Sequence, residues 1–108
     1  MPQADEQFSA VRKGLLEFAL LTLIAAERVY VADIMARLSA TPFATQEGTL
    51  YPLLSRLRRE ELLDYEWVES EAGPPRKYYS LTERGEARLT DLGAYWRLLT
   101  DTLSQLGR

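Results

Sequence analysis

The side chains best suited to binding chemistry lie in one stretch, residues 44–63. Gln46, Thr49 and Ser55 are short polar groups, and Arg56 and Arg59 carry guanidinium groups. Such groups form hydrogen bonds with base edges and with phosphates in nucleic acids. The stretch therefore predicts a surface that binds nucleic acid. The alternative is a surface helix whose arginines are only solvated.

Hydrophobic spacing predicts that this stretch is an amphipathic helix. Leucines recur at intervals of three and four residues, which leaves the polar side chains on the opposite face. These leucines are Leu50, Leu53, Leu54 and Leu57. We expect the hydroxyl of Thr45 to cap the first turn. Because Pro52 lacks an N–H and crowds the carbonyl of Gly48, we expect a bend or a tightened first turn and not a break.

The composition argues against an enzyme and against a metal site. The chain of 108 residues has no histidine and no cysteine, so it lacks the commonest general base, the commonest metal ligand and any thiolate. No pair of carboxylates stands apart from the solvated charges. We therefore expect no catalytic activity, no metal and no cofactor.

Charge and hydropathy bound the partners of the chain. The formal net charge is −3 at pH 7, whereas nucleic-acid-binding domains usually carry a basic face. Charges are screened over about 8–10 Å at physiological salt, so local patches decide phosphate binding. Arg56, Arg58 and Arg59 form one basic patch, and Arg76 and Lys77 form another. The sequence shows no bilayer-spanning run and no signal-peptide pattern, so we expect a cytoplasmic protein without a membrane partner.

Two further helices are predicted before the polar helix. Residues 1–12 predict an N-terminal arm, with a short helix over residues 5–12. Residues 14–26 are almost continuously apolar, which predicts a buried helix. Residues 31–38 repeat the helical pattern, and Pro42 disfavours helix after them. A helix, a connector and an amphipathic helix with a polar face make up a helix-turn-helix.

A β-hairpin is predicted next. Residues 64–70 alternate polar and apolar, residues 71–75 contain a Gly-Pro-Pro turn signal, and residues 76–81 are aromatic and compatible with a strand. Tyr78 and Tyr79 are expected to pack on opposite faces of this second strand. A hairpin directly after a helix-turn-helix is a wing.

Two cations lie on this wing. Arg76 and Lys77 are placed to bind a backbone phosphate or to enter a minor groove. The alternative is solvated charge on an exposed edge strand.

Residues 83–106 predict a long helix, capped by Thr82. Its apolar residues alternate in steps of three and four, a heptad rhythm typical of helices that pack on another helix. They are Leu89, Leu92, Trp96, Leu99, Leu103 and Leu106. We expect this seam to pack on a second copy in a two-fold dimer; the alternative is that it folds back on the core. Tyr95 and Trp96 are candidates for a site that binds a flat aromatic or cationic effector.

These elements predict a mainly α (α+β) protein. It is a winged helix-turn-helix with a two-stranded β wing and a long C-terminal dimerisation helix. Residues 1–82 form the DNA-binding domain, and residues 83–108 form the dimerisation helix, packed with it as one compact unit.

Two long motifs show a family resemblance. The first is Glu47-Gly48-Thr49-Leu50-Tyr51-Pro52-Leu53-Leu54-Ser55-Arg56-Leu57, and the second is Gly73-Pro74-Pro75-Arg76-Lys77-Tyr78-Tyr79-Ser80-Leu81-Thr82-Glu83-Arg84-Gly85. With these motifs the chain resembles the PadR family of winged-helix transcriptional repressors, from Lys13 to the C-terminus. The single C-terminal helix is similar to that of the short subfamily, whose members dimerise through it.

The resemblance implies a repressor of neighbouring genes that a small effector releases from DNA. It implies DNA contacts at the start of the recognition helix and at the wing. Carried over residue by residue, these are Gln46, Thr49, Tyr51, Arg56, Arg76 and Lys77. In some short members an aromatic residue of the last helix lines a drug-binding pore, and Trp96 occupies the comparable place. Residues 28–33 depart from the His-Gly-Tyr of many members, and their valines favour a short extended segment before the helix.

The sequence is compatible with two functions. The first is a dimeric, sequence-specific repressor that binds double-stranded DNA at a pseudo-palindromic operator, with half-sites one or two helical turns apart. The second is a winged-helix module that binds other proteins and has no specific DNA site, which the net negative charge favours.

Overall fold

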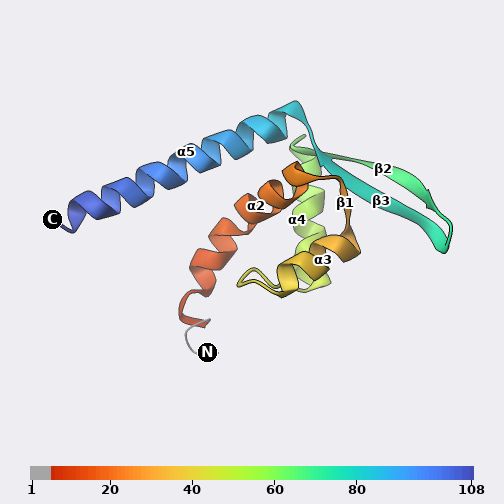
Figure 1. Cartoon of the computed structure of the whole chain (residues 1–108), viewed down its shortest axis with the longest axis horizontal. Coiled ribbons are helices and arrows are strands. Elements are labelled where there is room, and N and C mark those ends of the chain that lie inside the picture. Colours follow the sequence, from red (N-terminus) through yellow and green to blue (C-terminus); the bar gives the residue numbers. More distant parts are fainter. Residues whose placement is uncertain (1–5) are drawn as a thin grey trace.

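The structure is a computed structural model, and it describes residues 6–108. Its elements in order are α2 (Ser9–Ala26), β1 (Val29–Tyr30), α3 (Val31–Ser39), α4 (Glu47–Arg59), β2 (Leu63–Ser70), β3 (Gly73–Leu81) and α5 (Glu83–Leu106). Figure 1 shows α2, α3 and α4 gathered in the body, while α5 and the β2–β3 hairpin extend from it in opposite directions. The fold is α+β, a winged helix-turn-helix, as the sequence predicts.

The core lies where the apolar faces of α2, α3 and α4 meet the base of the sheet. Its fully buried side chains are almost all leucine: Leu20, Leu21, Leu50, Leu54, Leu57, Leu62 and Leu63, with Ile34 and Val29. Each fully buried side chain of this size contributes about 2 kcal/mol of hydrophobic stabilisation. The predicted apolar faces of the three helices are therefore confirmed, and they fix which face of α4 remains outside.

The N-terminal segment differs from the predicted boundaries. The helix predicted to begin near Gly14 begins at Ser9, inside the predicted arm. Glu6 and Gln7 are also helical, and Phe8 forms a turn before α2. Residue 5, where the short helix was predicted to begin, lies outside the described residues.

The start of α4 differs from the prediction by one residue. Thr45 was expected to cap the helix, but the N-cap is Gln46, and within the described residues its side chain makes no capping hydrogen bond. The connector instead closes on Thr41, whose hydroxyl donates to the Leu38 carbonyl at 2.8 Å and accepts from the Phe43 amide at 3.0 Å. Helix α4 then continues through Pro52 without a break, as expected.

The end of α4 comes earlier than predicted, because the chain turns at Glu61. The backbone φ of Glu61 is 63°, in the left-handed region. The Leu62 amide donates to the Leu57 carbonyl at 3.0 Å, and the Glu61 amide donates to the Arg58 carbonyl at 2.9 Å. This pair of bonds is a Schellman motif, in which glycine usually takes the left-handed position. With glutamate there, the sequence carries no stop signal, and the leucines at 62 and 63 were read as helix.

The sheet has three antiparallel strands in the order β1-β3-β2. The hairpin strands β2 and β3 form the two-stranded wing that was predicted, and the short strand β1 adds a third through the pairs Val29↔Tyr79 and Tyr30↔Tyr78. Tyr79 is buried in the core and Tyr78 stacks with Tyr30 on the other face, so their predicted placement is confirmed.

The turn of the wing lies before the position that was predicted. Glu71 and Ala72 form it, while Gly73, Pro74 and Pro75 already belong to β3. The strands shift register between Val68 and Ser70, opposite the prolines. Strand β1 pairs only with Tyr78 and Tyr79 in the described structure, so the prolines face one neighbouring strand and their missing N–H groups leave no central ladder unpaired.

Helix α5 is capped as predicted, because the Thr82 hydroxyl accepts from the Gly85 amide at 2.9 Å. Its first half packs on the body through Leu89 and Leu92, which are half-buried against the core. Its second half is solvent-exposed and accounts for much of the long axis of the molecule, whose extents are 58 × 35 × 21 Å.

Candidate nucleic-acid interface

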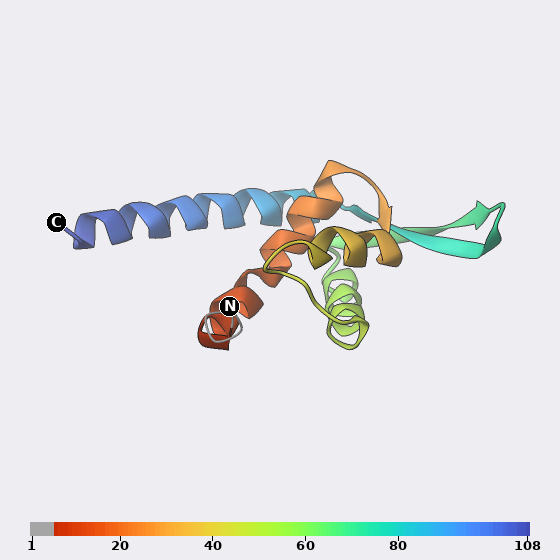
Figure 2. The same cartoon turned by 60° about the horizontal axis from the view of Figure 1, so that its bottom comes forward.

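Helix α4 presents its polar face away from the core. Leu50, Leu54 and Leu57 point inward, and Ser55 and Arg59 are exposed on the opposite side of the helix. Figure 2 shows α4 projecting from the body on the side where α2 begins. Helix α4 therefore lies at one edge of the molecule, where nothing in the described structure would prevent it from entering a groove of a nucleic acid.

One flank of α4 faces the wing. Tyr51 is 46% exposed, and together with Glu47 it lines a hollow of about 490 Å³. The wing residues Trp67, Arg76 and Lys77 also line this hollow. The structure thus brings together three residues that the sequence proposed separately as DNA contacts, one on α4 and two on β3.

The other flank of α4 faces α2 and carries Arg56. Its guanidinium donates to Glu60 at 2.9 Å and to Glu17 of α2 at 3.1 Å. The hydrogen bonds with Glu60 and then Glu17 raise the pKa of Arg56 above its ordinary value. Two carboxylates therefore hold a charge that the sequence assigned to DNA.

Arg76 and Lys77 lie on opposite faces of β3. Lys77 points to the core side of the sheet, where its Nζ lies 4.1 Å from the centre of the Tyr65 ring and 5.5 Å from that of Trp67. Arg76 points to the other side, with its Cζ 4.5 Å from the centre of the Tyr30 ring. Attraction between a cation and an aromatic face favours these positions. The wing consequently carries a cation toward each of its sides.

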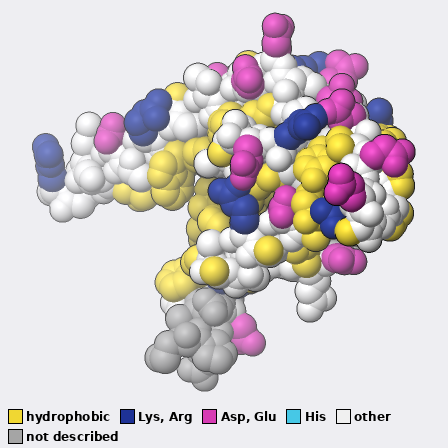
Figure 3. Space-filling model, turned by 45° about the vertical axis from the view of Figure 1, so that its right-hand side comes forward, with side chains coloured by type: hydrophobic (Ala, Val, Ile, Leu, Met, Phe, Trp, Pro, Cys, Tyr) yellow, Lys and Arg dark blue, Asp and Glu magenta, His cyan; other side chains and the backbone are white. Residues whose placement is uncertain are grey.

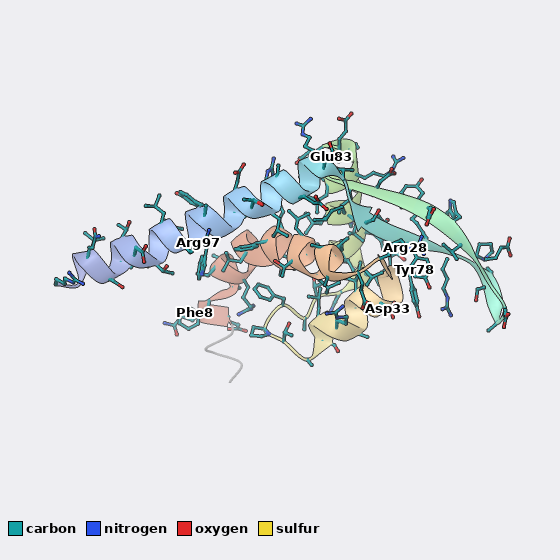
Figure 4. All side chains as sticks on the ribbon, turned by 45° about the horizontal axis from the view of Figure 1, so that its top comes forward. Phe8, Arg28, Asp33, Tyr78, Glu83 and Arg97 are labelled. Atoms are coloured by element: carbon teal, nitrogen blue, oxygen red, sulfur yellow. The ribbon has the colours of Figure 1, made fainter. Side chains whose placement is uncertain are left out.

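The face of the wing that bears Arg76 also carries an acid. Arg28 pairs with Glu66, and its Cζ lies 5.5 Å from the centre of the Tyr78 ring. Figure 4 shows Arg28 and Tyr78 side by side at the junction of the sheet with the body. Figure 3 shows acidic and basic side chains interspersed over the face that contains the wing. On this face the positive charge is therefore local and not continuous.

Three cations near this surface were not among the predicted DNA contacts: Arg58, which the sequence placed in a basic patch, and Arg12 and Lys13, which it missed. Arg58 lies with its Cζ 4.5 Å from the Tyr65 ring centre, near the face of the wing that bears Lys77. Arg12 and Lys13 of α2 line a hollow of about 160 Å³ together with Thr49 at the start of α4. The signal for Arg58 was its place in the arginine cluster, while nothing local to residues 12–13 predicts their approach to α4.

Tyr79 supports this surface from beneath. The centre of its ring lies 5.9 Å from the centre of the Tyr65 ring, between the wing and the core. Burial, and then the neighbouring Tyr51 and Tyr65, raise the pKa of the Tyr79 hydroxyl above its ordinary value. The hydroxyl is therefore neutral near pH 7, and the positive charges of this surface come from the arginines and lysine around it.

Apolar side chains of α5 form a second candidate site. Trp96, which is 43% exposed, borders two hollows. The larger, of about 550 Å³, lies between α2 and the end of α3 with the connector that follows it, and the smaller, of about 400 Å³, lies between α5 and α2. Leu15 and Phe18 of α2 line both hollows, and Tyr95 and Leu99 line the smaller one. The predicted seam is thus divided: Leu89 and Leu92 pack partly on their own chain, while the residues from Trp96 onward are exposed.

The described residues show neither a metal cluster nor a membrane-spanning helix. No three acidic, histidine or cysteine side chains among residues 6–108 are grouped as ligands for an ion. Over the same residues, no helix combines the length and apolar character needed to cross a bilayer.

A helix-turn-helix followed by an antiparallel wing, with a polar face on its exposed second helix, defines a winged-helix nucleic-acid-binding protein. Residues 20–91 match the transcriptional regulator PadR-like family, and the chain belongs to this family. Helix α4 and the wing both lie within the matched residues.

Solved structures agree with this assignment. A PadR-like transcription factor from Bacteroides fragilis is 46% identical, with a TM-score of 0.80 over 94% of this chain and 98% of that one. A PadR family transcriptional regulator from Eggerthella lenta is 30% identical, with a TM-score of 0.85 over 97% of this chain and 92% of that one. An uncharacterised protein of Lysinibacillus sphaericus is 31% identical over 82% of this chain and 84% of its own length. The chain is thus a winged-helix transcriptional regulator.

Proposed function

We propose that the protein is a cytoplasmic homodimer that represses transcription by binding a pseudo-palindromic operator. The observation that carries this proposal is the exposed polar face of α4 beside two wing cations. In the dimer, each α4 enters a major groove and each wing contacts the adjacent backbone or minor groove. Two-fold symmetry of the protein is then matched by two half-sites in the DNA.

The contacts divide by chemistry. The side chains that read base edges are at the start and on the outer face of α4: Gln46, Thr49, Tyr51, Ser55 and Arg59. Arg76 and Lys77 bind phosphates: Arg76 is an exposed cation, and Lys77 is a half-buried cation on the opposite face of the wing. The guanidinium of Arg56 already donates hydrogen bonds to Glu17 and Glu60. Arg56 can therefore contact DNA only if it breaks one of these two bonds.

The dimer interface is the exposed half of α5. Leu103 is 66% exposed and Leu106 is 75% exposed, and Trp96 and Leu99 lie on the same side of the helix. A row of large apolar side chains on a projecting helix is unusual for a monomer and typical of an interface. The α5 of a second copy, packed along this row, covers it and brings the two DNA-binding surfaces into a symmetric pair.

The effector site lies at Trp96, between the protomers. The hollows that border Trp96 have predominantly apolar walls; Phe18 lines both, and Tyr95 lines the smaller one. Apolar walls with exposed aromatic rings suit a flat aromatic or cationic molecule. Binding of the effector there moves the two α5 helices apart or changes the angle between them, and the DNA is released as a result. If quenching of tryptophan fluorescence by such a molecule survives in Trp67→Phe and vanishes in Trp96→Phe, the site is supported; the reverse pattern contradicts it.

Fluorescence anisotropy on the DNA upstream of its own gene tests the proposed function. We expect the protein to prefer this duplex over a scrambled one of the same composition, with an affinity that falls steeply as salt rises. Equal weak binding to both duplexes removes the operator from this upstream DNA. Undetectable binding even at low salt, together with a stable heteromeric complex, supports the second candidate, a protein-binding module, which the net charge of −3 favours.

A further inference from the structure

Glu17 connects the two helices on which the proposed function depends. One of its carboxylate oxygens accepts from Arg56 of α4 at 3.1 Å, and the other accepts from Arg88 of α5 at 2.9 Å. The Glu17 side chain is only 20% exposed, so its charge is partly shielded from solvent. A single carboxylate of α2 thus bridges the DNA-binding helix and the proposed dimerisation helix.

A second connection joins the same two helices directly. The amide of Thr82, at the start of α5, donates to the Leu62 carbonyl at 3.1 Å, and its hydroxyl donates to the Glu61 carbonyl at 2.6 Å. A Cβ added at Gly85 would lie 2.0 Å from the Leu62 carbonyl oxygen, so only glycine allows this approach. The end of α4 and the start of α5 therefore meet in one tight corner.

A corner alone fixes where the helices meet but does not fix the angle between them. A second point of attachment, away from the corner on both helices, removes this freedom. Arg56 and Arg88 provide it, because each lies about one turn or slightly more from the corner on its own helix and both are held by Glu17. Figure 1 shows α2 in the angle between α5 and α4, where it can connect them.

We propose that Glu17 is a positioning residue that sets the angle between α4 and α5. The consequence for DNA rests on the proposed function: if α5 forms the dimer, this angle determines the separation of the two α4 helices. That separation selects the spacing of the half-sites. Glu17 therefore contributes to operator specificity without touching DNA.

The chain offers a matched control in Glu60. Glu60 also accepts from Arg56, at 2.9 Å, but it belongs to α4 itself. Replacing Glu60 removes a carboxylate from the same arginine and leaves the link between the helices intact. In Glu17→Gln, by contrast, a single amide oxygen replaces two carboxylate oxygens, so one of the two arginines loses its acceptor. Arg88→Gln is a second test variant, which removes only the ion pair between Glu17 and α5.

The angle is measured as a distance within one chain. The protein has no cysteine, so spin labels attach only at introduced sites, Ser55→Cys on α4 and Asp101→Cys on α5. Doubly labelled chains are diluted into excess unlabelled protein, without DNA, so that only the distance within a chain is observed. We expect Glu17→Gln and Arg88→Gln to shift or broaden the distance distribution, and Glu60→Gln to leave it unchanged. If both test variants give the distribution of Glu60→Gln while circular dichroism shows them folded, the proposal is wrong.

A separate assay tests the consequence for DNA. Unlabelled variants are titrated with duplexes whose half-sites are one base pair closer or further apart than in the preferred duplex. We expect Glu17→Gln to flatten the preference for one spacing several-fold, whereas a loss of general stability would lower affinity for all spacings equally. A spacing preference that Glu17→Gln leaves intact overturns the specificity role. If even the unmodified protein prefers no duplex, the proposed function fails, while the distance measurement still decides the role of Glu17.

Discussion

Arg76 and Lys77 are adjacent in the chain, yet they contact opposite faces of β3. Lys77 lies 4.1 Å from the ring centre of Tyr65 on the side of α4, and Arg76 lies 4.5 Å from that of Tyr30 on the other side. A wing inserted beside the DNA backbone can therefore reach phosphates on either side of itself. Two separate phosphate contacts predict that the effects of the two cations on DNA binding add, whereas a single basic patch does not.

Lys77→Ala and Arg76→Ala are expected to act independently. If each cation neutralises one phosphate, each substitution lowers the slope of log affinity against log salt by about 0.9, and the double variant lowers it by about 1.8. Anisotropy titrations at four or more salt concentrations give these slopes. The control is Arg97→Ala, an exposed arginine on α5 far from the wing, which should leave the slope unchanged. Single variants that match the double variant would indicate one shared phosphate.

Gly48→Ala is expected to change stability and DNA binding in opposite directions. An added Cβ at Gly48 meets nothing within 4 Å, and the residue is exposed in the first turns of α4. Alanine should therefore stabilise the protein by about 0.5 kcal/mol, which urea denaturation measures at fixed protein concentration. A DNA backbone that approaches α4 closely would meet the new methyl group, so the affinity should fall. Unchanged affinity would mean that the backbone does not approach at Gly48.

Glu61→Gly is expected to stabilise the protein by about 1 kcal/mol, because glycine adopts the left-handed conformation without strain. The native φ at this position is 63°. Among residues 6–108, the contact recorded for the side chain that is removed is a long, exposed one with Arg84, at 3.7 Å, whose loss costs little. Chemical denaturation measures the change.

The neighbouring residue provides the control for this prediction. Glu60 has a φ of −80°, so glycine there relieves no strain and should destabilise the protein through its greater freedom in the unfolded chain. If both glycine variants were destabilised equally, strain at Glu61 would not be the reason for its effect.

Leu103→Lys is expected to break the proposed dimer. Leu103 is 66% exposed on its own chain, so the substitution should leave the fold of the protomer intact. In an interface, the buried ammonium group would be unpaired and would weaken association strongly. Sedimentation velocity should show a monomer, while Asp101→Lys, on the opposite side of α5, should remain dimeric. A dimer that persists in Leu103→Lys would place the interface elsewhere.

Local patterns in the sequence were sufficient to predict the helices and the wing. The leucine spacing of α4 identified the face that is buried, and Thr82 identified the start of α5. These features depend on residues three or four positions apart, whose relation is set by helical geometry alone. The division of Tyr78 and Tyr79 between two faces follows in the same way from the alternation of a strand.

Other features depended on residues that are distant in the chain, and only the tertiary structure decided them. Nothing local indicates that Arg56 turns to Glu17, or that Glu17 also holds Arg88, because packing of α2 against α4 and α5 brings these charges together. Helix α4 ends at a strained glutamate since the burial of Leu62 and its contact with α5 favour the turn there, against the local preference of the residue. The sequence by itself thus determined which elements form and which of their faces are apolar. Packing, which depends on the whole chain, decided the pairing of charges and the corner between α4 and α5. It thereby decided the orientation of α4.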